Sequence, residues 1–197
     1  MNLLNRLAVV FTVASVLTLD SQICRAEVKI DSIEIGIGNI SRPGVWTAAR
    51  VTVSGIDGLD ADFELVTPDP SNSPVVFPGG QLTANADGTA SGTTYFKAGR
   101  LDTSVVIRVL DRASRELLAT RRITTQPQAD GPARFSMVRH DRPVWLIVGE
   151  MPAFESESHD VSQIQLATAT DLPVQWRDYS VCDVVILAGQ FELNGEQ

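Results

Sequence analysis

In Val28-Lys29-Ile30-Asp31-Ser32-Ile33-Glu34-Ile35-Gly36-Ile37, apolar and polar side chains alternate through the later part of the stretch. A period of two residues is typical of a β-strand with one buried and one solvated face. A Pro43-Gly44 turn then leads into a second strand-forming run at 46–54. Further runs of this kind lie at 62–66, 75–77, 81–83, 90–96, 104–110 and 117–124.

Turn-forming residues separate these runs, including Pro78-Gly79-Gly80, which predicts a turn between 75–77 and 81–83. Short strands at intervals of roughly 8–12 residues, with no helical pattern between them, are typical of a β-sandwich. The Cys…Trp…Cys framework of antibody domains is absent. The strand pattern therefore predicts an immunoglobulin-like β-sandwich over residues 27–127.

The C-terminal part has a different pattern. Two continuous apolar runs, 144–148 and 184–187, are typical of strands covered on both faces in a parallel sheet. Residues 159–170 between them predict a helix, and the side chains on one face would be Val161, Ile164, Gln165 and Thr168. The expected fold is mostly β: the sandwich, a linker or last edge segment at 128–141, and an incomplete α/β (βαβ) segment at 142–197.

Residues 1–26 are predicted to be a secretory signal peptide. A short polar region with one basic residue precedes an uncharged apolar run at 7–19, and Cys24-Arg25-Ala26 places small residues before a cleavage point. The apolar run is shorter than the roughly 20 residues of a spanning helix, which makes a retained N-terminal membrane anchor the weaker alternative. Cleavage near Ala26 predicts an exported protein, periplasmic or extracellular.

Charge and cysteine content narrow the function classes. The formal net charge is −8, and loss of the signal peptide makes it one unit more negative. Such a chain repels phosphate backbones, and no cluster of Lys and Arg offsets this, so nucleic acid is not an expected partner. Cleavage also leaves Cys182 as the only cysteine, which rules out an intrachain disulfide.

Cys182 is the first candidate for chemistry, as a thiol nucleophile with His140 or His159 as its base. A nucleophile elbow follows its strand and has glycines around it. Cys182 precedes its strand and lies between Val181 and Asp183. We therefore expect a small buried residue at a strand entrance, with both histidines on the surface.

Three further features are weaker. Asp57, Asp60 and Asp62 suit calcium as clustered carboxylates, but they lack the register of an EF-hand, and an acidic turn facing solvent is favoured. The Gly-x-Gly at 36–38 lacks the rest of a dinucleotide fingerprint. Glu150 follows the carboxyl end of a strand, which is where ligands bind in open α/β sheets. We expect no catalytic, cofactor-binding or metal-binding residue.

Two stretches resemble a known family: Gly44-Val45-Trp46-Thr47-Ala48-Ala49-Arg50-Val51-Thr52-Val53-Ser54-Gly55, and residues 172–187 with the pattern Leu-Pro-x-x-Trp-x-x-Tyr-x-x-x-Asp. They are similar to large exported bacterial membrane proteins. In those proteins an N-terminal β-sandwich precedes a domain like class I glutamine amidotransferases, and a membrane-spanning part usually follows. The resemblance implies that Trp176 and Tyr179 cap the sheet edge before the last strand, and that this chain is a truncated relative.

The expected function is a non-enzymatic, exported interaction module of the cell envelope. Its partner would be an unidentified envelope protein or the remainder of a membrane-anchored homologue. A hydrolase or amidotransferase using Cys182, and a calcium-stabilised adhesion module using Asp57, Asp60 and Asp62, are the alternatives.

Overall fold

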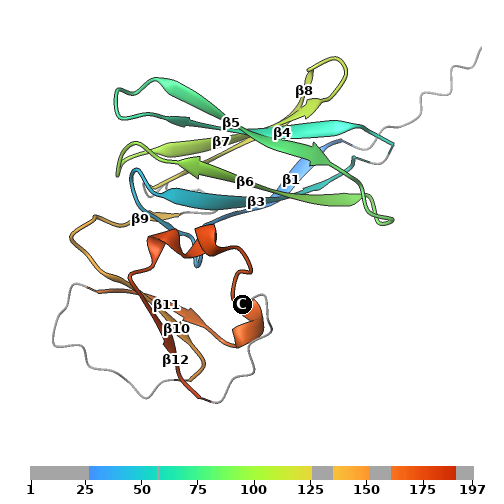
Figure 1. The fold of residues 1–197 in the computed structure, drawn as a ribbon. Coiled ribbons are helices and arrows are strands. Elements are labelled where there is room, and N and C mark those ends of the chain that lie inside the picture. Colours follow the sequence, from blue (N-terminus) through green and yellow to red (C-terminus); the bar gives the residue numbers. More distant parts are fainter. Residues whose placement is uncertain (1–26, 57, 126–134, 151–160, 190–197) are drawn as a thin grey trace, which may run out of the picture.

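A computed structural model describes residues 27–56, 58–125, 135–150 and 161–189 of the chain (Figure 1). The predicted signal peptide and its cleavage point lie outside these ranges. The described chain is mostly β, with two antiparallel sheets, a parallel sheet and a short parallel strand pair. The two helices in these ranges are short 3₁₀ segments, and neither has the length and apolar character needed to cross a membrane.

Two antiparallel sheets make up the N-terminal part of the fold, which we call the two-sheet unit. The first sheet has the order β1-β3-β6, from β1 (Lys29–Ile35), β3 (Trp46–Ser54) and β6 (Thr89–Lys97). The second has the order β5-β4-β7-β8. Its strands are β4 (Ala61–Pro68), β5 (Pro74–Leu82), β7 (Ser104–Asp111) and β8 (Leu117–Thr124).

Both sheets contribute to one hydrophobic core. In β3, β4 and β7 buried side chains largely alternate with less buried ones, as the period of two requires. From the first sheet come Val51 and Phe96, and from the second Phe63, Leu65 and Ile107, all at most 2% exposed. The core therefore forms between elements that lie far apart in the sequence.

The Pro78-Gly79-Gly80 stretch does not form the predicted turn. It lies inside β5, which is one continuous edge strand with a bulge opposite Phe63 and Glu64. An edge strand tolerates proline because one side of its backbone is not hydrogen-bonded to another strand of the sheet. A Cβ atom on Gly79 would lie 2.3 Å from the Phe63 ring, so this glycine makes room for the largest core side chain nearby.

The segment expected to be a linker or last edge segment contains a short strand. β9 (Ser136–Met137) pairs in parallel with β2 (Ile40–Ser41). Phe135, just before it, is 1% exposed and belongs to the main core. Phe135 and Met137 are therefore packed on the main core, whereas 126–134 lie outside the described residues.

The C-terminal sheet is parallel and has the order β11-β10-β12. β10 (Val144–Val148) and β12 (Val184–Leu187) are the two predicted strands, and their parallel pairing is confirmed. The helix predicted at 159–170 is wrong for its described part, because Ser162–Leu166 forms strand β11. Polar and apolar residues alternate in β11, and only Ile164 is fully buried, which suits an edge strand better than a helix.

The prediction that both apolar runs are covered on both faces holds for only one of them. Four of the five residues of β10 are buried, because this strand lies between β11 and β12. In β12, Val184, Val185 and Leu187 are 41%, 45% and 43% exposed. Among the described strands, none pairs with the outer edge of β12. The apolar residues of β12 are therefore not buried by a further strand in the described part of the chain.

A second hydrophobic cluster joins the C-terminal sheet to the two-sheet unit. Leu146 and Ile164 of the C-terminal sheet pack with Ile37 from the loop between β1 and β2. Gly38 in this loop has a φ of +62°, and a Cβ atom on it would lie 2.8 Å from Ile164. The loop thus needs glycine both for its backbone conformation and for the close approach of the C-terminal sheet.

Candidate functional site

Cys182 is a poor nucleophile in this structure. It follows the 3₁₀ helix η2 (Trp176–Val181), and its side chain packs on the second hydrophobic cluster. Burial raises the pKa of its thiol to about 11, and the charge of Asp183 adds to the effect. An activated cysteine needs the opposite environment, one that stabilises the thiolate. The geometry supports the prediction of a small residue packed at a strand entrance.

The two histidines are not seen to support Cys182. The ring Nε2 of the exposed His140 lies 2.9 Å from the carbonyl oxygen of Pro43. His159 lies outside the described residues. Only His140 can therefore be placed, and its described contact is with Pro43 and not with Cys182.

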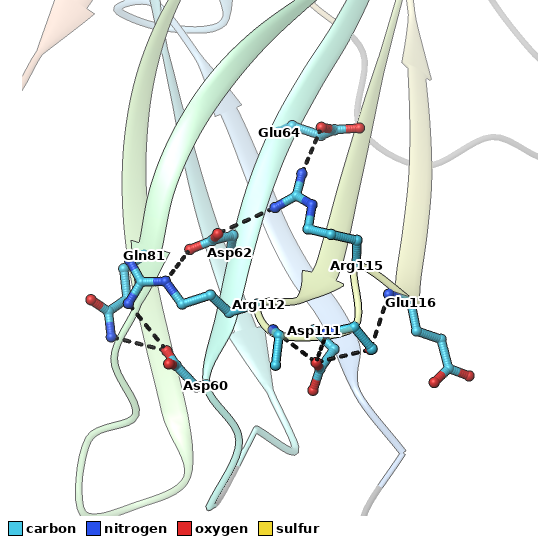
Figure 2. Close-up of polar contacts among 10 residues, drawn as sticks. Asp60, Asp62, Glu64, Gln81, Asp111, Arg112, Arg115 and Glu116 are labelled. Atoms are coloured by element: carbon cyan, nitrogen blue, oxygen red, sulfur yellow. Dashed lines mark hydrogen bonds and ion pairs between the residues drawn. The ribbon is translucent and has the colours of Figure 1, made fainter.

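The acidic stretch considered for calcium is paired with arginines (Figure 2). Asp60 and Asp62, next to and within β4, face Arg112 and Arg115 of the β7–β8 turn at 3.2–3.5 Å. The amide of Gln81 also donates to Asp60, at 3.0 Å. Asp57 lies outside the described residues, and among those described no group of three or more potential ligands is close enough to hold a metal ion. The arginines give Asp60 and Asp62 a role in joining β4 to the β7–β8 turn.

Glu150 is exposed at the end of β10. The backbone carbonyl of its neighbour Gly149 accepts a hydrogen bond from the side-chain amide of Gln165. Gly149 also donates its N–H to Leu166, at 3.0 Å. These contacts tie the end of β10 to β11.

A hollow lies between the first sheet and the segment that carries η1 (Ala169–Asp171) and η2. It has a volume of about 610 Å³, within the range of small-molecule sites, and we call it the η groove. One wall is the outer face of the first sheet, and the other is the chain from Leu166 to Asp178. Its polar lining consists mainly of Glu34, Arg50, Thr93, Tyr95, Gln175 and Asp178.

Alternation along the strands explains why these side chains meet. Val51 and Val53 of β3 point into the main core, so Arg50 lies on the opposite face. Glu34 of β1 and Thr93 of β6 are its register partners on the two neighbouring strands. The three side chains therefore form a polar row across the outer face of the sheet.

An ion pair crosses the groove wall. The Nη2 atom of Arg50 lies 2.5 Å from Oδ2 of Asp178 in η2, whose side chain is 3% exposed. No described group lies in hydrogen-bonding geometry to the other oxygen, Oδ1, which is buried. Tyr95 also interacts with Asp178: burial raises the pKa of the Tyr95 hydroxyl, and the negative charge of Asp178 and a side-chain hydrogen bond to it raise this pKa further. The groove wall thus contains a buried carboxylate that is paired with Arg50 and lies beside Tyr95.

A second ion pair fixes the start of β12. Arg42, 6% exposed, donates from Nη1 and Nη2 to the two carboxylate oxygens of Asp183, at 3.0 and 2.5 Å. Nη2 also donates to the carbonyl of Arg142, at 2.6 Å. The backbone N–H of Val144 donates to Asp183 Oδ2 at 2.7 Å, so this carboxylate links β10, β12 and the two-sheet unit.

An aromatic hollow adjoins the η groove and shares Thr93 and Tyr95 with it. Its other walls include Trp46, Phe77 and Arg177. The Arg177 guanidinium lies 5.8 Å from the Tyr95 ring centre and 5.4 Å from that of Trp176. The expected capping role fails for Trp176, which is 71% exposed. Tyr179 packs on the second hydrophobic cluster, and its hydroxyl donates a hydrogen bond to the backbone carbonyl of Pro173, at 2.7 Å.

The sequence interpretation missed Arg50 and Asp178. Arg50 could have been noticed, because a charged residue on the solvent-facing side of a predicted strand is a candidate for lining a binding surface. Asp178 gave no signal, because nothing in the sequence distinguishes it from an exposed aspartate. No family model and no curated protein matches this chain in sequence comparisons.

Proposed function

We propose that the chain is a non-enzymatic, exported interaction module of the cell envelope that binds its partner at the η groove. The observation that carries the proposal is the groove itself, a hollow of about 610 Å³ whose two walls come from separate parts of the chain. Its floor is a regular sheet, and its other wall is held by the Arg50–Asp178 and Arg42–Asp183 pairs. Such a preorganised polar surface suits recognition, because little ordering is needed on binding.

The two-sheet unit would be an immunoglobulin-like β-sandwich. What supports this assignment is the strand order, β1-β3-β6 against β5-β4-β7-β8, with a shared core. Non-consecutive strands pair within each sheet, as in Greek-key sandwiches. The suggested kinship with exported sandwich-containing membrane proteins would place this module at the envelope, with its signal peptide removed near Ala26.

Site-directed photo-crosslinking would test this function. A photo-reactive amino acid replaces Thr93 in the groove of the full chain, and a second variant carries it at Thr120 on β8, in the other sheet. The expected result is a discrete crosslinked envelope component at position 93 that is absent at position 120. The same crosslinks from both positions, or none from either, would contradict an interaction role for the groove.

Mass spectrometry of the secreted or periplasmic chain would test export and removal of the signal peptide. The intact mass of the secreted or periplasmic chain should correspond to a start just after Ala26. Recovery of full-length chain in the membrane fraction would instead support the retained anchor.

A further inference from the structure

The aromatic hollow beside the η groove is lined by exposed rings. It has a volume of about 450 Å³, and its walls include Trp46, Phe77, Tyr95 and the guanidinium of Arg177. Trp46 is 40% exposed, and Trp176, which contacts the same guanidinium, is 71% exposed. Tryptophan is well buried on average, so two exposed tryptophans near one arginine are uncommon on a protein surface. Interfaces concentrate Trp, Tyr and Arg at the positions that carry most of the binding free energy, and the composition of this hollow therefore indicates a binding surface.

Strand alternation brings the rings and two cations to one face of the first sheet. Trp46 of β3 and Lys97 of β6 are register partners, and Tyr95 lies two residues before Lys97. Phe96 between them points into the main core, so Tyr95 and Lys97 lie on the outer face. The Lys97 ammonium lies 4.7 Å from the centre of the Trp46 ring, and Arg177 reaches Tyr95 from η2, which packs against β3. Both cations therefore lie next to the rings of the hollow.

The hollow carries positive charge on an acidic chain, which has 24 acidic and 16 basic residues. No carboxylate is among the described residues that line it. Lys97 and Arg177 form no ion pair with any carboxylate that the structure describes, whereas Arg50 is paired with Asp178 in the η groove. A contact with a ring face leaves the N–H donors of these two cations available to an acceptor. An anionic group on an apolar body would complement this surface.

The exposed apolar area extends beyond the hollow, along β5 and along the chain that leads to η2. On β5, Val75 lies on the same face as Phe77 and is 36% exposed. Near η2, Val174 and Trp176 are 53% and 71% exposed. A small molecule would fill the hollow alone. An extended polypeptide segment presents side chains at regular intervals, so it can contact both the hollow and the area on either side.

We propose that the aromatic hollow binds an acidic segment of a partner polypeptide that also carries aromatic side chains. A carboxylate of the segment contacts Arg177 and Lys97, and a neighbouring aromatic ring packs on the rings of the hollow. This inference rests on the proposed function, because it gives the partner of the interaction module a chemistry. It extends the interaction surface from the η groove to the hollow that adjoins it.

Binding is measured on the exported full chain by calorimetry with three capped tetrapeptides. Acetyl-Glu-Phe-Glu-Phe-amide carries both features, the Gln-Phe-Gln-Phe version lacks only the charges, and the Glu-Ala-Glu-Ala version lacks only the rings. The first should bind about tenfold more tightly than either of the others, because each of these loses one of the two kinds of contact. Equal affinity for the Glu-Phe peptide and either of the others, or no binding of any peptide, would overturn the proposal.

Arg177→Gln and Lys97→Gln test the two cations separately, because both side chains are exposed and can lose their charge without disturbing the core. Each change should weaken binding of the Glu-Phe peptide by about fivefold and leave binding of the Gln-Phe peptide unchanged. Arg122→Gln on β8, in the other sheet, is the matched control: it also removes one exposed arginine charge, and it should leave the affinity unchanged. Unchanged affinity in Arg177→Gln or in Lys97→Gln would contradict the assignment, and melting curves show whether the variants have kept their fold.

Two further results separate this inference from its alternatives. Phenylacetate carries a ring and a carboxylate without a polypeptide backbone; if it binds as tightly as the Glu-Phe peptide, the hollow is a small-molecule site and the polypeptide partner is wrong. If crosslinking at Thr93 succeeds while no peptide binds, the interaction function stands and this inference fails. If the Glu-Phe peptide binds as expected while Thr93 gives no crosslink, the inference stands and the η groove is not the partner's site.

Discussion

At the residue scale, environment and not residue type determines what the reactive side chains can do. Cys182 was the first candidate for a nucleophile, although its place before a strand favoured a packed residue, and its thiol indeed packs against apolar side chains and next to Asp183. Both features favour the protonated form. Asp178, an ordinary aspartate in the sequence, is buried beside Arg50 and becomes the central charged group of the η groove.

Cys182 should alkylate slowly at neutral pH. Its pKa of about 11 lies above the ordinary value of 9.0, so burial stabilises the folded protein below pH 9, and this contribution is lost as the pH rises toward 11. Rates of iodoacetamide labelling, followed by intact mass, should therefore increase with pH up to about 11. Unfolded protein in denaturant is the control and should react much faster at pH 8. Rapid labelling of the folded chain at pH 7 would contradict this prediction and support the alternative of an enzyme that uses Cys182.

Gly92→Ala should destabilise the two-sheet unit. A Cβ atom on Gly92 would lie 2.4 Å from the Phe63 ring, and overpacking of this kind costs about 1–3 kcal/mol. Chemical denaturation measures the free energy of unfolding. Adding Phe63→Leu should cost less in the Gly92→Ala background than in the native one, because the smaller side chain relieves the contact. Strict additivity of the two changes would contradict this reading of the core.

At the element scale, short segments connect the C-terminal sheet to the two-sheet unit. The β1–β2 loop brings Gly38 against Ile164, and β9 pairs with β2. Arg42, between β2 and β3, binds the carboxylate just before β12. Each of these contacts involves only a few residues, but together they place η2 along β3 and so form the groove.

The Arg42–Asp183 contact should weaken in acid. Hydrogen bonding from Arg42 holds the pKa of Asp183 below its ordinary value of 3.8, so the carboxylate stabilises the fold above that pH, and the contribution disappears as the pH falls through the lowered pKa. Thermal unfolding should show wild type above Asp183→Asn at pH 7, with the gap closing below pH 3.8. Glu116→Gln is the control and should follow wild type at neutral pH. A gap that is independent of pH would mean that the charge of Asp183 contributes nothing.

At the scale of the whole molecule, two hydrophobic clusters meet at the β1–β2 loop. The larger one belongs to the two sheets, and the smaller one needs Ile37 as well as its own residues. A three-stranded sheet with only one well-covered strand buries little surface by itself. The C-terminal sheet therefore depends on docking for its stability.

Arg50→Gln should loosen the C-terminal part selectively, because Asp178 would lose the positive charge that compensates its burial. Hydrogen exchange read by mass spectrometry should speed up in peptides from 161–189 and stay slow in β4 and β7. Arg108→Gln, which removes a more exposed ion pair with Glu64, is the matched control and should change neither region much. Equal acceleration throughout the chain would show that both parts unfold as one unit.

The sequence by itself determined the mostly β character and the two parallel strands β10 and β12, because alternation and continuous apolar runs are local patterns that survive in the fold. It could not give β11, because a five-residue run with few apolar residues satisfies helical and strand periodicity alike, and its pairing with β10 decides between them. Nor could the sequence show that β10 is buried and β12 exposed. Both strands are aliphatic, and only their positions in the sheet decide how much of each is buried. The η groove was decided by tertiary structure alone: Arg50 and Asp178 are 128 residues apart, and their contact exists only because η2 docks on the outer face of β3.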